Sequence, residues 1–213
     1  MTTYEQKREV LREAELDLMR RRERVAQLRR DLPEGDVVGD YTFVDVESGI
    51  EVKLSELFSG DERTLILYHY MFGKAQTEPC PLCSMWIDGY NAVAHHVRQR
   101  ADFVVLAAAT PEELRDVAKR RGWDNIRLLS AGDGTFKKDF GSETENGEQI
   151  ERVSVYTRHH GVVRHQYSSG AELAPGQRER GIDLLSPVWH LFDLTPEGRG
   201  DWYPSLTYDE GGR

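Results

Sequence analysis

Apolar positions divide the middle of the chain into two short, nearly continuous runs with a longer amphipathic stretch between them. Residues 64–71 form the strongest run, rich in β-branched residues, Leu and Tyr, which favours a central strand buried on both faces. Residues 103–109 form a second run of this kind. Between the two runs, residues 81–100 carry apolar side chains at three- and four-residue steps, and this spacing predicts a helix. Strand, helix and strand in this order indicate a βαβ unit with a right-handed crossover.

Shorter segments surround this unit, and the clearest of them is a helix over residues 111–121. Thr110 is the expected cap, Pro111 the first helical residue and Glu113 the partner of the cap, while Gly122 stops the helix. The remaining pattern predicts a hairpin over 41–46 and 50–54, a helical turn over 55–58, a short strand over 126–129, a second hairpin over 153–156 and 162–167, and a last helix from Ser186. Together these elements predict an α/β fold with a mixed central sheet flanked by helices.

Residues 4 to 31 have the pattern of one long, highly charged helix, which ends at the segment 33–35. Its apolar residues recur at an a/d-like spacing with one break, at Arg21, and they are Leu11, Ala14, Leu18, Val25, Leu28 and Leu32. Two interpretations follow: the helix lies on the domain, or it is an arm that pairs with a second subunit in a homo-oligomer. We therefore expect an N-terminal helical arm over residues 1–35 and one domain over residues 36–213.

Composition narrows the classes of function. The net charge of −9 argues against nonspecific binding to nucleic acid, which needs a basic face. No run of eighteen apolar residues is present, so no membrane span is expected. The N-terminus is charged and lacks the apolar segment of a secretory signal, and we expect a cytoplasmic protein.

The sequence contains two cysteines, Cys80 and Cys83, in the motif Cys80-Pro81-Leu82-Cys83 between the first buried run and the helix. A thiolate at a helix N-terminus is stabilised by free N–H groups and by the helix dipole. We expect Cys80 to be the exposed attacking thiolate and Cys83, one turn into the helix, to be the buried resolving thiol.

Two other interpretations of the pair are a structural zinc half-site and two inert thiols. Tetrahedral zinc needs two further ligands, and the nearest histidine cluster, at His159, His160 and His165, lies far along the chain. In a reducing compartment, a close pair of cysteines is more often catalytic or metal-binding than a structural disulfide.

Four stretches of the sequence carry a family resemblance. They are the N-terminal helix followed by Asp40-Tyr41-Thr42-Phe43, then Leu67-Tyr68-His69-Tyr70-Met71-Phe72-Gly73, then Cys80-Pro81-Leu82-Cys83-Ser84-Met85-Trp86, and the tail from Gly181-Ile182-Asp183-Leu184-Leu185 through Asp193-Leu194-Thr195-Pro196-Glu197-Gly198-Arg199. The chain resembles a thioredoxin-like family, a domain of unknown function related to the alkyl hydroperoxide reductase and thiol-specific antioxidant branch of the thioredoxin superfamily. The resemblance implies a thioredoxin-like fold, and it implies a thiol-redox fold more firmly than a particular reaction.

The chain departs from both patterns that this superfamily offers. A thioredoxin places a cis-proline before the strand that faces its active site, where this chain has Arg152. The peroxiredoxin motif is matched by Thr77 three residues before Cys80, and Arg152 could supply its distant arginine, but Gly73 stands at the position of its upstream proline. A Thr hydroxyl and an Arg guanidinium would polarise a peroxide beside the thiolate.

His69 is a further candidate, as a proton shuttle for Cys83 or as a buried, hydrogen-bonded side chain. It alternates with Tyr68 and Tyr70 along the strand, so it should face the opposite side of the sheet.

These observations predict a thiol–disulfide oxidoreductase that needs no organic cofactor or metal and acts on a disulfide substrate. A separate thiol reductant would supply its electrons. The first alternative is a thiol peroxidase in which peroxide oxidises Cys80 to a sulfenic acid that Cys83 resolves. The second is a non-catalytic thioredoxin-fold assembly protein that interacts through its N-terminal helix.

Overall fold

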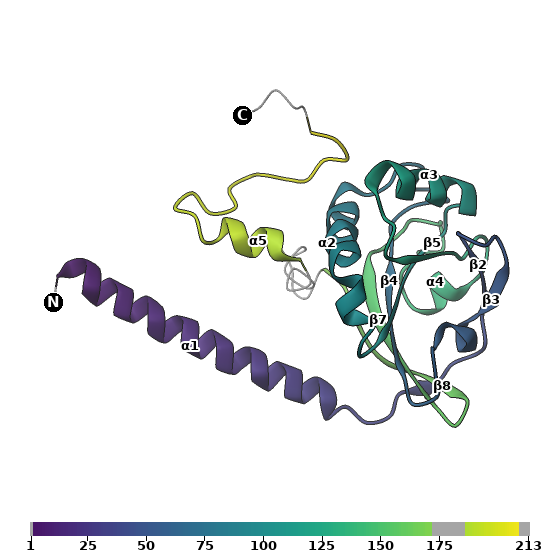
Figure 1. The fold of residues 1–213 in the computed structure, drawn as a ribbon, viewed down its shortest axis with the longest axis horizontal. Helices are drawn as coiled ribbons and strands as arrows, with labels where there is room; N and C mark the ends of the chain where they lie inside the picture. Colours follow the sequence, from purple (N-terminus) through teal and green to yellow (C-terminus); the bar gives the residue numbers. More distant parts are fainter. Residues whose placement is uncertain (1, 172–185, 209–213) are drawn as a thin grey trace. The chain divides into compact units, whose positions relative to one another are not determined.

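The computed structural model describes residues 2–171 and 186–208. The chain divides into two compact units, Met1–Gly35 and Asp36–Arg213, which are described separately (Figure 1). No helix within the described ranges is both long enough and apolar enough to cross a membrane. The Gly181–Leu185 part of the family resemblance lies outside the described residues.

The first unit is the single helix α1, which runs from Thr3 to Arg30. Thr2 caps it: its side-chain oxygen accepts a hydrogen bond from the backbone N–H of Glu5, and the Glu5 carboxylate accepts one from the N–H of Thr2. This reciprocal pair satisfies two of the N–H groups that lack partners at a helix start. No residue of α1 is buried, so the apolar stripe predicted from the sequence is exposed.

The second unit is built on one mixed sheet of eight strands in the order β1-β8-β7-β4-β5-β6-β2-β3 (Figure 1). The strands are β1 (Asp36–Val37), β2 (Thr42–Asp45), β3 (Glu51–Lys53), β4 (Thr64–His69), β5 (Asp102–Ala107), β6 (Arg127–Ser130), β7 (Arg152–His159) and β8 (Val162–Ser169). Strand β4 is central, parallel to β5 and antiparallel to β7. The mixed sheet and the βαβ unit predicted from the sequence are confirmed.

The helices of this unit lie on both faces of the sheet, and they are η1 (Leu54–Leu57), α2 (Pro81–Val97), α3 (Pro111–Arg121), α4 (Phe136–Asp139) and α5 (Pro187–Phe192). Helices α2 and α3 share one hydrophobic core with Tyr68 and Tyr70 of the central strand region. The helix η1 and Phe136 of α4 share a second core with Leu65 and Leu67. The central strand is therefore buried on both faces, as its continuous apolar run predicts.

The observed elements differ from the predicted ones mainly at their ends. Helix α2 stops at Val97 rather than at residue 100. The second hairpin is longer than predicted because β7 runs from Arg152 to His159 and β8 continues to Ser169. Its tight turn is made by His160 and Gly161, both with positive φ, as a two-residue hairpin loop requires. The sequence pattern did not predict the two-residue strand β1 or the four-residue helix α4.

Candidate functional site

Cys80 is the N-cap residue of α2, at the point where the chain arrives from the central strand. Its backbone N–H donates to the carbonyl oxygen of Met71 at 3.1 Å, which ties the loop to the end of β4. Its side-chain sulfur accepts a hydrogen bond from the backbone N–H of Cys83 at 3.5 Å. Pro81 takes the first helical position, where a proline costs no intrahelical hydrogen bond. The sulfur of Cys80 therefore lies at the positive end of a 17-residue helix.

This position favours the thiolate form of Cys80. Its pKa is lowered to about 7, first because the Cys83 thiol donates a hydrogen bond to it and then because the N–H groups of Cys83 and Leu82 do so. Partial burial and the Glu151 carboxylate oppose this shift. A cysteine with a pKa near 7 is substantially ionised at neutral pH and is a competent nucleophile.

Cys83 has the opposite character. It is completely buried, and burial followed by the neighbouring Cys80 raises its pKa well above the usual value. The Tyr68 hydroxyl and the Met71 amide act in the other direction and lower the pKa. The two sulfurs one helical turn apart are thus an accessible thiolate and a buried thiol.

Aromatic side chains surround Cys83 on the inner side. Tyr68 contacts Trp86 and Tyr90 edge to face, with ring centroids 6.2 Å and 5.3 Å apart. Within the described ranges, the Trp86 indole N–H and the Tyr90 hydroxyl have no hydrogen-bond partner. Donors of this kind are available to a sulfur that acquires negative charge.

The loop before Cys80 is fixed by Gly73. Its φ is +101°, and a Cβ atom at this position would lie 2.1 Å from the backbone nitrogen of Ala109. Gly73 and Gln76 exchange backbone hydrogen bonds of 2.7 Å and 3.0 Å. The next residue, Lys74, forms an ion pair of 2.7 Å with the buried carboxylate of Glu143. The close approach explains why glycine, and not proline, stands at this position.

His69 lies on the opposite face of the sheet from the cysteines, as its alternation with Tyr68 and Tyr70 predicts. Its Nε2 is 2.9 Å from the Ser154 hydroxyl, and its Nδ1 is 2.7 Å from the Ser142 hydroxyl. Its ring stacks on Phe136, and burial holds its pKa well below the usual value. The structure therefore supports the buried, hydrogen-bonded interpretation of His69 and not the proton shuttle.

Arg152 does not approach the cysteines. It pairs with His69 across β4 and β7, so the two side chains share the face that is turned away from Cys83. Arg152 lines a pocket of about 370 Å³ together with His165 and Ser168. Thr77 is exposed on the loop before Cys80. Of the five candidate residues, the structure brings together Cys80 and Cys83. The peroxide-polarising role of Arg152 stays a prediction that its place opposite His69 does not support.

The described residues place no cluster of metal ligands around the two sulfurs. In the part of the chain that the structure describes, no group of three or more His, Cys, Asp or Glu side chains is arranged to hold a metal ion. His159, His160 and His165 belong to the β7–β8 hairpin and its turn. The zinc half-site therefore finds no further ligands among these residues.

The structure adds one residue that the sequence did not suggest. Lys137 of α4 is completely buried, and its Nζ donates to the carbonyl oxygen of Tyr70 at 3.2 Å. Burial lowers the pKa of Lys137 to about 7, while Cys83 and Glu143 raise it. No sequence signal marks this residue, because a lysine in a polar, glycine-rich stretch is ordinarily exposed.

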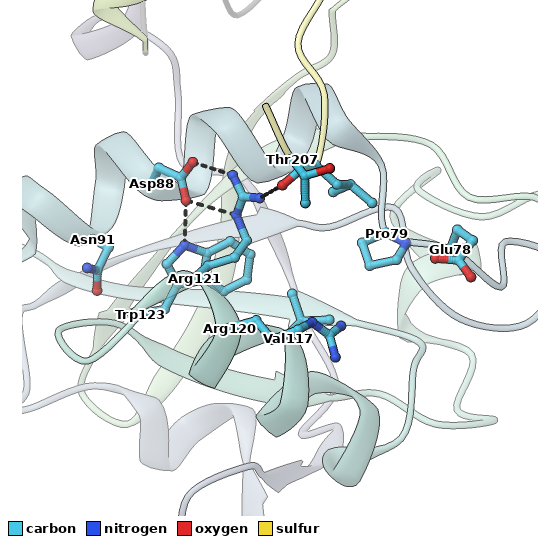
Figure 2. Close-up of a pocket in the computed structure, with 10 residues that line it drawn as sticks. Glu78, Pro79, Asp88, Asn91, Val117, Arg120, Arg121, Trp123 and Thr207 are labelled. Carbon is cyan, nitrogen blue, oxygen red and sulfur yellow. Dashed lines mark hydrogen bonds and ion pairs between the residues drawn. The ribbon is translucent and has the colours of Figure 1, made fainter. Parts of the chain in front are cut away.

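A groove of about 370 Å³ lies between α2 and α3 beside the loop that leads to Cys80 (Figure 2). Glu78 and Pro79, which precede Cys80, form one end of it, and Asn91 lies at the other. In its middle, Arg121 forms an ion pair of 2.5 Å with Asp88 and donates to the carbonyl oxygen of Leu206 at 2.9 Å. A space large enough for part of a substrate thus adjoins the loop that carries Cys80.

The chain belongs to the family described as "Bacterial protein of unknown function (DUF899)", which matches residues 1–209. Its fold is similar to that of the peroxidoxin BcpB from Mycobacterium tuberculosis, with a TM-score of 0.56, 19% identity and coverage of 72% of this chain and 94% of that one. A peroxiredoxin-like protein from Aquifex aeolicus is also similar, with a TM-score of 0.50, 14% identity and coverage of 75% and 88%. At these identities the similarity establishes the thioredoxin-like fold.

Proposed function

We propose that this protein is a thiol–disulfide oxidoreductase in which Cys80 attacks the substrate and Cys83 resolves the intermediate. The observation that carries the proposal is the opposite shift of the two thiol pKa values within one helical turn. An accessible thiolate followed by a buried thiol provides a nucleophile and a second thiol held in reserve. Cys80 and Cys83 are not joined by a disulfide in the structure, which corresponds to the reduced form of the pair.

The reaction has two displacement steps. The Cys80 thiolate attacks one sulfur of a substrate disulfide, and the other substrate sulfur leaves as a thiolate. Cys83 then loses its proton and attacks the Cys80 sulfur, which releases the first substrate sulfur and closes the Cys80–Cys83 disulfide. Residues three apart on a helix have Cβ atoms about 5–6 Å apart, so small movements bring the sulfurs into bonding distance. A separate dithiol reductant restores the pair, which suits a reducing compartment such as the cytoplasm.

The test is the alkylation of each cysteine across pH, followed by mass spectrometry. We expect half-maximal reactivity of Cys80 near pH 7, in line with its pKa, and little reaction of Cys83 at that pH. Oxidation with glutathione disulfide should give the Cys80–Cys83 disulfide, whereas Cys83→Ser should stop at the mixed disulfide on Cys80. Two thiols that react only above about pH 8.5 and never pair would contradict the proposal.

A thiol peroxidase is the second candidate, and the fold similarity to the peroxidoxin and the peroxiredoxin-like protein favours it. In that reaction the Cys80 thiolate would attack hydrogen peroxide to give a sulfenic acid and water, and Cys83 would release a second water on forming the disulfide. The placement of Arg152 on the far face removes a donor that would stabilise the departing oxygen. We therefore expect disulfide reduction to exceed peroxide consumption when both are measured under the same reductant.

An assembly protein without thiol chemistry is the third candidate, and the exposed apolar stripe of α1 supports it. Unreactive cysteines in the alkylation experiment, together with self-association through α1, would favour this function over both enzymes.

A further inference from the structure

Lys137 is an unusual residue for the interior of this fold. Its side chain is completely buried, and it has no ion pair within the described ranges of the chain. The nearby carboxylate of Glu143 is bound by Lys74, with two contacts of 2.7 Å and 2.9 Å, and by the Gln149 amide at 3.2 Å. A lysine buried without a paired carboxylate is costly and requires a physical explanation.

The explanation lies in a single peptide group. The carbonyl oxygen of Tyr70 accepts the hydrogen bond from Lys137 Nζ, and Met71, which supplies the N–H of the same peptide group, accepts a hydrogen bond from the Cys80 N–H through its own carbonyl. The Met71 N–H lies on the side of the Cys83 thiol, and it lowers the pKa of that thiol. The described chain contains no cis peptide bond, so the carbonyl and the N–H point in opposite directions. Lys137 and Cys83 therefore lie on opposite sides of one peptide group and are linked through it.

Two electrostatic effects connect these residues. A cation at the Tyr70 carbonyl polarises the peptide group and increases the partial positive charge of the Met71 N–H on the side of the sulfur. The charge of Cys83 also stabilises the ammonium form of Lys137 directly, and this effect is reciprocal. Both effects favour a negative charge on Cys83 when Lys137 is protonated.

We propose that Lys137 is a positioning residue for the resolving step, because its ammonium group stabilises the thiolate that Cys83 forms before it attacks Cys80. The proposal rests on the thiol–disulfide function above. Cys83 gives its proton to water, its thiolate forms a bond to the Cys80 sulfur, and the bond between Cys80 and the substrate sulfur breaks. Lys137 keeps its proton during this step. Four other titratable groups interact electrostatically with Lys137, and they are Cys83, Glu143, Lys74 and His69.

The experiment follows both thiols in one reaction with dithiobis(nitrobenzoate). Cys80 attack releases a first nitrothiobenzoate, and Cys83 attack on the mixed disulfide releases a second, so stopped-flow absorbance resolves two phases. In Lys137→Met the first phase should be unchanged and the second slower at pH 7. A rise of one unit in the Cys83 pKa lowers the fraction of Cys83 that is thiolate about tenfold. A thiolate of higher pKa is more nucleophilic, and this recovers about threefold of the rate. The second phase should therefore slow about threefold for each unit by which the pKa rises.

Lys138→Met is the matched control. Lys138 is the next residue on α4, but it is partly exposed and 3.7 Å from Glu145. Both phases should keep their rates and pH profiles in this variant. Lys137→Arg, which retains the charge, should recover part of the second phase, and Lys137→Gln provides a second neutral variant. A second phase in Lys137→Met with the same rate and pH profile as in the unmodified protein would overturn the proposal.

A measurement on the unmodified protein tests the reciprocal effect. The lysine Nζ signals can be titrated by NMR with the pair reduced and with the Cys80–Cys83 disulfide formed. In the reduced pair the ammonium and the Cys83 thiolate stabilise each other, so part of the Lys137 ammonium should persist to a higher pH than in the disulfide form, where Cys83 cannot ionise. Identical titration curves in the two forms contradict the proposal. Absence of a second nitrothiobenzoate phase in the unmodified protein would instead refute the dithiol function itself.

Discussion

At the scale of single residues, the site is controlled by burial and hydrogen bonds that shift the pKa values of its groups. Cys80 gains its negative charge from hydrogen bonds at a helix start, and Cys83 is kept neutral by complete burial. Lys137 is buried beside them with one hydrogen bond to a backbone oxygen. An arrangement of this kind is costly for stability and is more easily understood as a requirement of chemistry.

The cost of burying Lys137 gives a prediction about stability. Its pKa is about 7 in the folded protein, against an ordinary value of 10.5, so the unfolded chain binds more protons between these values. The stability that depends on this group is full above pH 10.5 and is lost as the pH falls towards 7. Lys137→Met should therefore raise the free energy of unfolding at pH 7 by about 1–4 kcal/mol. The Tyr70 carbonyl would remain bonded to the N–H of Phe72 at 3.1 Å.

Urea denaturation of the reduced protein at pH 7 and at pH 10 measures this effect. The gain from Lys137→Met should be smaller at pH 10, where the unfolded chain loses part of its proton excess. Lys138→Met should change the free energy of unfolding by less than about 0.5 kcal/mol at either pH. A Lys137→Met protein that is less stable than the unmodified protein at pH 7 contradicts the prediction.

At the scale of elements, the position of the loop before Cys80 depends on the close approach of Gly73 to the chain just after β5. Gly73→Ala should destabilise the protein by about 2–5 kcal/mol, because it combines a left-handed φ with a contact of 2.1 Å to the Ala109 nitrogen. The loop would have to move, so the alkylation midpoint of Cys80 should also rise. Thermal unfolding and alkylation across pH measure the two effects.

Gly49→Ala is the control for this prediction. Gly49 also has a positive φ, of +71°, but a Cβ atom there would meet no atom within 4 Å. The substitution should cost about 1–2 kcal/mol and leave the reactivity of Cys80 unchanged. Equal costs at the two positions would show that the close approach has no effect of its own.

The elements that the sequence predicted well are those with a strong local signal. Helix α3 starts at Pro111 with a capping box of Thr110 and Glu113, and it ends at Gly122 in the left-handed conformation, all as expected from residue types alone. Strand β1 and helix α4 are too short to show a periodic pattern, and they exist because tertiary contacts hold them. Local sequence thus determines long elements and leaves the shortest ones undetermined.

The site was predictable to a similar degree. The spacing of Cys80 and Cys83 before a helix placed both sulfurs, and alternation placed His69 on the far face. The sequence left the position of Arg152 open, because its face depends on the register between β4 and β7, where it pairs with His69. Lys137 could not be found at all, since its burial depends on the packing of α4 against the end of the central strand.

At the scale of the whole molecule, the unexplained feature is the exposed apolar stripe of α1. The stripe contains Leu11, Leu18 and Val25, each seven residues from the next, and Leu32 continues this spacing two residues beyond the end of α1. Each of these four residues is between 41% and 51% exposed. Ala14 and Leu28 belong to a second row on the same side of the helix, and Arg21 interrupts this row between them. A helix of 28 residues is about 42 Å long, enough for an extended two-helix contact. This pattern is typical of a helix that pairs with a second copy of itself.

We therefore predict that the protein is a dimer through α1 and that the double substitution Leu18→Lys and Val25→Lys gives a monomer. Two lysines in the apolar seam would face the same residues of the partner helix, where their charges repel and remain poorly solvated. The control is Val10→Lys with Met19→Lys, which adds the same charge at two exposed apolar positions, 68% and 52% exposed, outside the seven-residue row. Sedimentation equilibrium measures the mass of each variant.

Both variants should release the two nitrothiobenzoate equivalents at the rates of the unmodified protein, because the substitutions lie outside the unit that carries Cys80 and Cys83. A monomeric unmodified protein, or equal dissociation by the two double substitutions, would leave α1 without the pairing role assigned to its stripe.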